Sequence, residues 1–146
     1  MDYCTLEDIQ IRIGTLPLAQ LTNDNGNDNQ IDTIVCEEAL IYSSKLIDGY
    51  LRGKYSLPLN THFPLLKVIA LDLSVYRLFS RRIYTEIPET ISENYKNAIK
   101  TLELLKKGVI TLETESDINL KSTGEYRTNK TELDKLFNKR VINFEY

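Results

Sequence analysis

The sequence predicts an all-α protein: a small helical bundle of about three main helices, with a short N-terminal helical pair before them and a C-terminal arm after them. Apolar residues recur at three-to-four spacing along three long segments, as on the buried face of a helix. Residues with helix-capping chemistry stand at the ends of these segments. The 146 residues, 42% of them apolar, allow one domain to bury a stable core without disulfides or a metal.

The N-terminal pair is predicted by its caps. Thr5 and Asp8 supply the hydroxyl and the acid of a capping box, and Gly14 ends the first short helix. The apolar residues between 16 and 21 continue the pattern as far as Thr22. A second short helix is therefore expected directly after Gly14.

A polar loop and the first long helix follow. Residues 22–32 contain four asparagines and three aspartates, whose side chains compete with the backbone hydrogen bonds of a helix. Asp32 then caps a helix of about 20 residues that ends at Gly53. The apolar stripe of this helix consists of Val35, Ala39, Tyr42, Leu46, Ile47, Tyr50 and Leu51.

The second long helix is expected to be the central one. Residues 54–63 lack a helical period and predict an extended crossover, after which Pro64 opens a helix that runs to about Arg82. Apolar residues nearly surround this helix, as in a mostly buried element. One polar stripe interrupts them, formed by Lys67, Ser74, Arg77 and Ser80.

Asp72 stands alone on the opposite, apolar side of this helix. We expect it to be a buried polar residue with a structural role, because a buried carboxylate must be paired or hydrogen-bonded. The available donors are Tyr50, Arg52, Lys54, Tyr55 and Tyr76, and the region from 50 to 55 is expected to supply the partner. A catalytic acid with a raised pKa is the alternative, but no second carboxylate stands beside Asp72 at helical spacing.

The third long helix starts at Pro88 and Glu89 and ends at Gly108, with Lys106 and Lys107 in its last turn. A brief extended segment is expected at 109–112. These observations divide the chain into a helical domain, 1–112, and a flexible C-terminal arm, 113–146, which is polar and without period at first. The arm ends in apolar residues that should dock on a surface, among them Leu133, Leu136 and Phe137.

Charge and composition exclude several classes of protein. The net charge is −3, which argues against a dedicated nucleic-acid binder. Residues 1–60 carry four basic and nine acidic side chains, whereas residues 61–112 carry eight and five. This asymmetry suits head-to-tail contact between identical copies, although helices often differ in charge without any docking role. The longest apolar stretch, 65–79, contains charged residues and predicts no membrane span.

The inventory of reactive side chains points away from an enzyme. His62 is the single histidine, which removes most metal and Ser-His-Asp schemes. Cys4 and Cys36 lack the spacing of a redox or metal motif and suit a reducing cytoplasm. No glycine-rich phosphate loop is present. We therefore expect no catalysis, no metal and no cofactor.

The asparagine- and aspartate-rich loop partly matches a calcium loop. Asp24, Asp28 and Asp32 occupy the first, fifth and ninth places of a twelve-residue EF-hand frame. The match then fails, because Asn29 replaces the glycine at the sixth place and Val35 replaces the bidentate acid at the twelfth. A solvated loop that caps the next helix is the preferred interpretation.

Three arginines near the end of the second long helix, Arg77, Arg81 and Arg82, stand close to Tyr76 and Tyr84. Interleaved basic and aromatic residues can bind phosphates. Cations at a helix C-terminus also oppose the helix dipole. We favour the dipole and a subunit interface over nucleic-acid binding.

One segment has a more specific pattern. Residues 47–59 read Ile-Asp-Gly-Tyr-Leu-Arg-Gly-Lys-Tyr-Ser-Leu-Pro-Leu. This segment, the opening residues 3–8, the Ala-Leu-Asp of 70–72, the Tyr-Arg-Leu of 76–78 and the Leu-Lys-Lys-Gly of 105–108 stand in the order found in the Mu-like phage head-to-tail connector family. The chain resembles that family over about residues 3 to 112.

The resemblance implies a structural protein without catalytic residues. Such a protein packs as a ring of identical copies between the portal of a phage or prophage head and the tail-side neck proteins, and DNA only passes through the ring. The expected location is the neck of the virion, after assembly in the host cytoplasm. A DNA-contacting or regulatory helical module is the alternative, and a small enzyme is a third interpretation.

Overall fold

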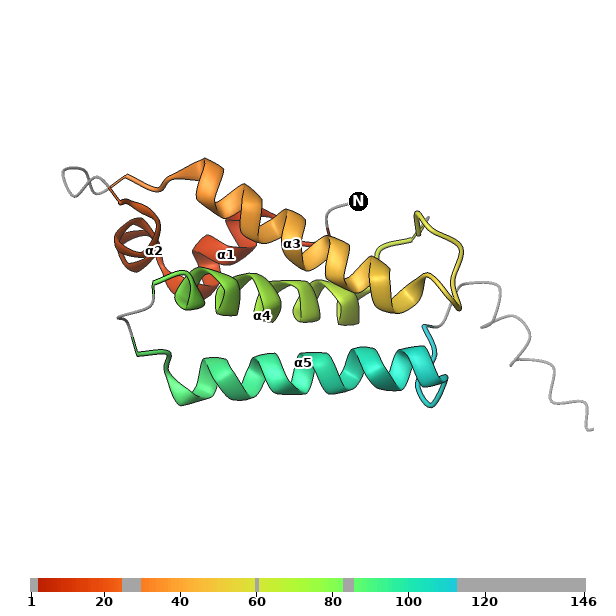
Figure 1. The fold of residues 1–146 in the computed structure, drawn as a ribbon. Coiled ribbons are helices and arrows are strands. Elements are labelled where there is room, and N and C mark those ends of the chain that lie inside the picture. Colours follow the sequence, from red (N-terminus) through yellow and green to blue (C-terminus); the bar gives the residue numbers. More distant parts are fainter. Residues whose placement is uncertain (1–2, 25–29, 60, 83–85, 113–146) are drawn as a thin grey trace, which may run out of the picture. The chain divides into compact units, whose positions relative to one another are not determined.

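Five helices form the described part of the chain, as predicted. They are α1 (Leu6–Ile13), α2 (Thr15–Thr22), α3 (Thr33–Leu51), α4 (Pro64–Ser80) and α5 (Glu89–Lys107). The structure is a computed structural model that describes residues 3–24, 30–59, 61–82 and 86–112, and no strand occurs in these ranges. The α3–α5 helices form the main bundle and α1–α2 the short N-terminal pair (Figure 1). The predicted arm, 113–146, lies outside the described residues.

The predicted caps define most of the helix ends. Thr5 and Asp8 form a reciprocal capping box at α1. The Asp32 carboxylate accepts hydrogen bonds from two backbone N–H groups in the first turn of α3. Gly14 and Gly108 end α1 and α5 with φ angles of 92° and 80°, in the region that favours glycine. These ends depend on local chemistry, which explains why the sequence predicts them.

Two helix ends and the segment after α5 differ from the prediction. The α3 helix stops at Leu51, and Gly53 has no positive φ; the turn is closed instead by the N–H groups of residues 54 and 55, which donate to the Leu51 carbonyl. The α4 helix ends at Ser80 rather than Arg82. Residues 109 and 110 do not extend, because their N–H groups donate back to the Leu104 carbonyl.

The α4 helix is the centre of the bundle, between α3 and α5 (Figure 1). It also packs against α1 and α2. Its fully buried leucines meet apolar side chains from the neighbouring helices, and burial of each such side chain contributes roughly 1.5–3 kcal/mol. The largest fully buried apolar side chains are Ile9, Leu18, Ile47, Leu51, Leu66, Leu73, Leu78, Leu102 and Leu105.

Ser74 corrects the predicted polar stripe of α4, since its side chain is fully buried. Its hydroxyl donates to the Ser43 hydroxyl of α3 at 2.9 Å, and Ser43 donates to the Leu40 carbonyl at 2.9 Å. The Cys4 sulfur lies 3.9 Å from the Ser74 oxygen. Buried hydroxyls that satisfy one another in this way are small enough to let α3 and α4 approach closely.

Candidate functional site

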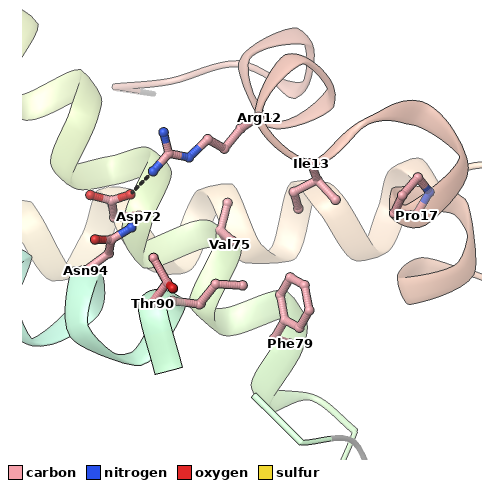
Figure 2. A pocket seen from close by; sticks show the side chains of 9 residues that line it. Arg12, Ile13, Pro17, Asp72, Val75, Phe79, Thr90 and Asn94 are labelled. Atoms are coloured by element: carbon pink, nitrogen blue, oxygen red, sulfur yellow. Dashed lines mark hydrogen bonds and ion pairs between the residues drawn. The ribbon is translucent and has the colours of Figure 1, made fainter. Parts of the chain in front are cut away.

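A groove with a mostly apolar lining lies between α1, α4 and α5 (Figure 2). Its volume is about 480 Å³, within the range of ligand and side-chain pockets. The α4 helix forms the floor, and residues from α1, α2 and the start of α5 complete it. The lining residues are Arg12, Ile13, Pro17, Asp72, Val75, Phe79, Thr90, Ile91 and Asn94.

The floor of the groove continues along α4 beyond the hollow itself. Positions 65, 68, 72, 75 and 79 follow one another at helical spacing and share one face. Leu65 and Val68 on this face are 40% and 56% exposed. The face therefore forms an apolar stripe, Leu65, Val68, Asp72, Val75 and Phe79, that is interrupted only by the carboxylate in its middle.

Asp72 lies on this floor, but its partner is not the predicted one. The Arg12 Nη2 of α1 lies 3.5 Å from the Asp72 Oδ1, and among the described residues no hydrogen bond or ion pair joins Asp72 to residues 50–55. The Asp72 side chain is 16% exposed and that of Arg12 is 52% exposed. Burial raises the pKa of Asp72, and Arg12 opposes this shift. The expectation failed because helical spacing does not tell which distant helix crosses this face.

The N-terminal helix is attached to α4 by a second ion pair. The Lys67 Nζ lies 2.8 Å from the Asp8 Oδ1. The hydrogen bond from Lys67 and the backbone hydrogen bond from Thr5 lower the pKa of the Asp8 carboxyl. Asp8 therefore serves both the cap of α1 and its contact with α4, which the capping pattern alone does not reveal.

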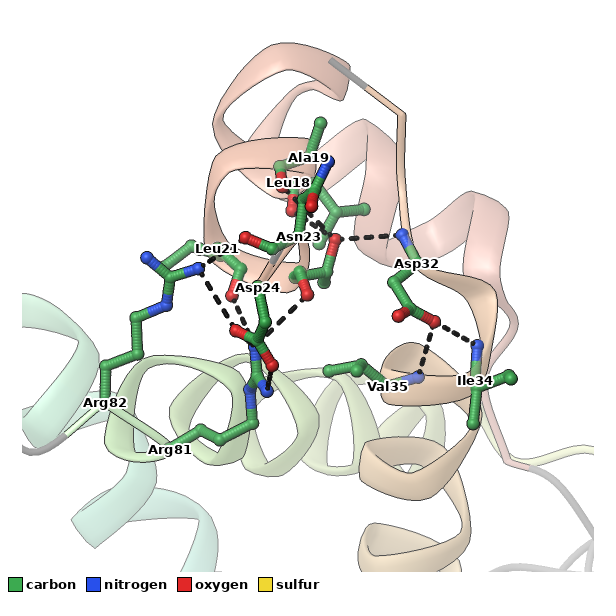
Figure 3. A network of polar contacts seen from close by, with 11 residues as sticks. Leu18, Ala19, Leu21, Asn23, Asp24, Asp32, Ile34, Val35, Arg81 and Arg82 are labelled. Atoms are coloured by element: carbon green, nitrogen blue, oxygen red, sulfur yellow. Dashed lines mark hydrogen bonds and ion pairs between the residues drawn. The ribbon is translucent and has the colours of Figure 1, made fainter. Parts of the chain in front are cut away.

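Arg81 and Arg82 form a clamp on the end of α2 (Figure 3). Arg81 Nη2 donates to the carbonyls of Leu21 and Thr22 at 3.1 and 3.2 Å and to the Asp24 Oδ1 at 2.8 Å. Arg82 Nη2 donates to the Asn23 carbonyl at 2.9 Å. Hydrogen bonding from Arg81 lowers the pKa of the Asp24 carboxyl and raises the pKa of Arg81.

The clamp changes the interpretation of these two arginines. They neutralise the carbonyl end of α2, a different helix from the one whose dipole they were expected to oppose. Their donors also bind groups of the same domain. Arg81 and Arg82 therefore have fewer hydrogen-bond donors left for a neighbouring subunit than the sequence suggests.

The polar loop is fixed at both of its described ends. The Thr22 hydroxyl donates to the Leu18 carbonyl at 2.9 Å and accepts from the Asp32 N–H at 3.1 Å. Asp24 binds the clamp and Asp32 caps α3, so two of the three aspartates that match the calcium frame have other partners. Asp28 lies outside the described residues, within which no three His, Cys, Asp or Glu side chains gather as a metal site.

Arg77 differs from the clamp, because its side chain is exposed. Its guanidinium lies 4.9 Å from the ring centroid of Tyr42 on α3, and Tyr76 stacks on Tyr95 of α5 at 4.0 Å. These aromatic contacts link α3, α4 and α5 on the surface. Tyr84 lies outside the described residues, as do Leu133, Leu136 and Phe137.

The two cysteines and the histidine that the sequence singled out do not lie together in a site. Cys4 and Cys36 are buried and form no disulfide bond, and burial raises the pKa of Cys36 to about 11. His62 is exposed in the crossover. The Tyr3 hydroxyl donates to the Asp48 carboxylate, a contact between residues 45 positions apart that no local pattern predicts. None of the described helices is long and apolar enough to span a membrane.

Comparison with known proteins identifies a protein family and a relative of this chain. A family described as Bacteriophage Mu, Gp36 matches residues 3–130. Gene product J of Escherichia phage Mu is 32% identical over 108 residues, which cover 74% of this chain and 74% of the phage protein. The matched segment includes the groove, the clamp and the Asp-Gly-Tyr to Leu-Pro-Leu segment.

Proposed function

The chain belongs to the bacteriophage Mu Gp36 family, and we propose that it is a structural adaptor subunit of a phage or prophage head-to-tail connector. In this role it forms a ring in the neck of the virion and contacts the portal on one side and tail-side neck proteins on the other. It works by contacts between subunits, without catalysis or a cofactor. The observation that carries the proposal is the family match over most of the chain.

The surface of the domain supports this role. A ring closed by one repeated contact needs two different, complementary surfaces on each subunit. One apolar surface is the stripe of α4, and another is the outer side of α3, where Ile34 is 68% and Ile41 is 47% exposed. Apolar side chains gathered on separate helices are typical of a subunit that is covered by neighbours.

The DNA-contacting alternative loses part of its support. Arg81 and Arg82 bind the end of α2, which leaves Arg77 as the exposed member of the predicted basic cluster. In a connector, DNA passes through the ring and requires no sequence-specific contact. A purified protein that binds a short DNA duplex tightly, with an affinity that falls steeply with salt, would favour the alternative.

A genetic experiment tests the adaptor role. A nonsense mutation in the gene of the phage or prophage that encodes the chain should leave DNA-filled heads and separate tails in the lysate, as seen by electron microscopy. The wild-type gene supplied on a plasmid should restore joined particles. Complete particles in its absence, or a block before DNA enters the head, would contradict the proposal.

A further inference from the structure

We propose that the groove between α1, α4 and α5 is the docking site for the apolar C-terminal segment, residues 133–144, of a neighbouring copy of this chain. The inference rests on the proposed ring, which brings copies side by side. It goes further by assigning one of the two surfaces of the repeated contact to a defined groove and the other to a defined segment.

The groove has the chemistry of a site for an amphipathic segment. Its floor is the apolar stripe of α4, of which Val75 is 5% exposed at the hollow and Val68 is 56% exposed beyond it. The polar groups of Arg12, Thr90 and Asn94 stand at its edges (Figure 2). Grooves that bind amphipathic peptides have such an apolar floor, which contacts the apolar face of the peptide.

Asp72 makes the groove selective. Its carboxylate lies in the middle of the apolar floor, and among the described residues it is paired with the half-exposed Arg12 by a single contact of 3.5 Å. A carboxylate on an apolar surface gains from a second cation when an incoming segment removes water from it. The groove therefore favours an occupant with a basic residue between apolar ones.

The C-terminal segment has this pattern. Its apolar positions 133, 136, 137, 141 and 144 would share one face of a helix. Arg140 falls on the same face, three and four positions after Phe137 and Leu136. A basic residue thus stands in the middle of the apolar stripe of the segment, as Asp72 stands in the middle of the stripe of α4.

The occupant is assigned to a neighbouring copy because the proposed ring holds identical copies side by side. The Leu112 N–H donates to the Tyr55 hydroxyl at 3.1 Å, near the end of α3. The groove lies at the opposite end of α5, beside Thr90 and Asn94. The 19 residues of α5 separate the two ends by roughly 28 Å. The 20 residues 113–132 are long enough to span this distance, so the trapping experiment must distinguish a link between two copies from a link within one chain.

Disulfide trapping in the full-length purified protein tests the inference. Thr90→Cys places a thiol at the edge of the groove, and Asn143→Cys places one at the edge of the apolar face of the segment, three positions after Arg140. Mild oxidation of the double variant over a rising series of protein concentrations should give covalent dimers and longer chains on a non-reducing gel. The native Cys4 and Cys36 are buried and should not contribute.

The matched control is Lys96→Cys with Asn143→Cys. Lys96 is exposed on α5, two positions from Asn94 and therefore on the opposite face of the helix. It should give several-fold less covalent dimer. Equal yields from the two pairs would overturn the inference, as would a fast-migrating monomer linked within one chain or the absence of any linked species at the highest concentration.

A charge exchange tests the role of Asp72 in the same trapping experiment. Asp72→Lys should lower the yield of covalent dimer several-fold, and adding Arg140→Glu should restore it. A yield that does not respond to either change would remove Asp72 from the contact. Because the experiment uses purified protein, a negative result would leave the genetic test of the connector role unaffected.

Discussion

Two arginine–aspartate pairs in this small domain have opposite characters. In the clamp, Arg81 is 29% exposed and Asp24 is 59% exposed, and the arginine also binds two backbone carbonyls. In the groove the exposure is reversed, because Arg12 is 52% exposed and Asp72 only 16%. The pKa of Asp24 is lowered and that of Asp72 is raised.

The Arg81–Asp24 pair stabilises the fold, whereas the Arg12–Asp72 pair can exchange one cation for another. Arg81 binds several fixed groups at once, so its removal would leave carbonyls at the end of α2 without their donor. Arg12 makes one long contact from a side chain largely in solvent, which a cation of another subunit can join or replace. The two pairs thus give measurements that should differ in size and in sign.

The largest effect is expected at the clamp. Arg81→Ala should lower the free energy of unfolding by about 1.5–3 kcal/mol, because hydrogen bonds from a charged donor to the carbonyls of residues 21 and 22 are lost. Arg81→Lys should recover only part of it, since a lysine cannot bind these carbonyls and Asp24 together in the same fork geometry. Urea denaturation of both variants measures this difference; an Arg81→Ala variant as stable as the wild type would break the comparison.

A smaller effect is expected at the groove. Arg12→Ala should lower the free energy of unfolding by roughly 0.2–1 kcal/mol, the range of an exposed ion pair. Loss of the partner of a fully buried charge would cost about 3 kcal/mol or more, but the exposure of Arg12 excludes that case. Thermal unfolding beside the Arg81→Ala variant ranks the two sites, and an equal loss at both would contradict the ranking.

The pH dependence of stability distinguishes the two aspartates. Because burial raises the pKa of Asp72 in the folded state, its ionisation weakens folding as the pH rises from about 3.9, the value of a free aspartate, through the raised pKa. Asp72→Asn should thus gain stability relative to wild type between acidic and neutral pH. Asp24→Asn should show the reverse, since a lowered pKa supports folding above the ordinary value. Unfolding curves over this pH range measure both signs.

The smallest effect is expected from calcium. With Asp24 in the clamp and Asp32 at the cap of α3, millimolar calcium should leave the melting temperature almost unchanged. A site of micromolar affinity would add about 4 kcal/mol at that concentration. A large rise with calcium, absent with magnesium, would show that Asp24 leaves Arg81 to bind the ion.

The sequence predicts the helices of this protein better than their contacts. The capping box at Thr5, the cap at Asp32 and the glycine end at Gly108 depend on residues within four positions of one another. The central place of α4 also follows from its own pattern, since apolar residues nearly surround it. The polar stripe was wrong at Ser74, because a serine can be buried when another helix supplies a hydroxyl.

The candidate site is less accessible to sequence reasoning. The pattern singles out Asp72, Arg81 and Arg82, but not their partners. Arg12 is 60 positions from Asp72 and Asp24 is 57 positions from Arg81, so each pairing depends on how the helices pack. The groove itself is formed by three helices and has no signature in any one of them.

The attachment of Leu112 has a mechanical consequence. Its side chain is 5% exposed, and its N–H is bound to the hydroxyl of Tyr55. A pull on the chain beyond this point would first load the core and the segment after α3. It would not unwind α5 turn by turn from its free end. In the proposed connector, tension from neighbouring copies would thus enter the domain at Tyr55 and Leu112.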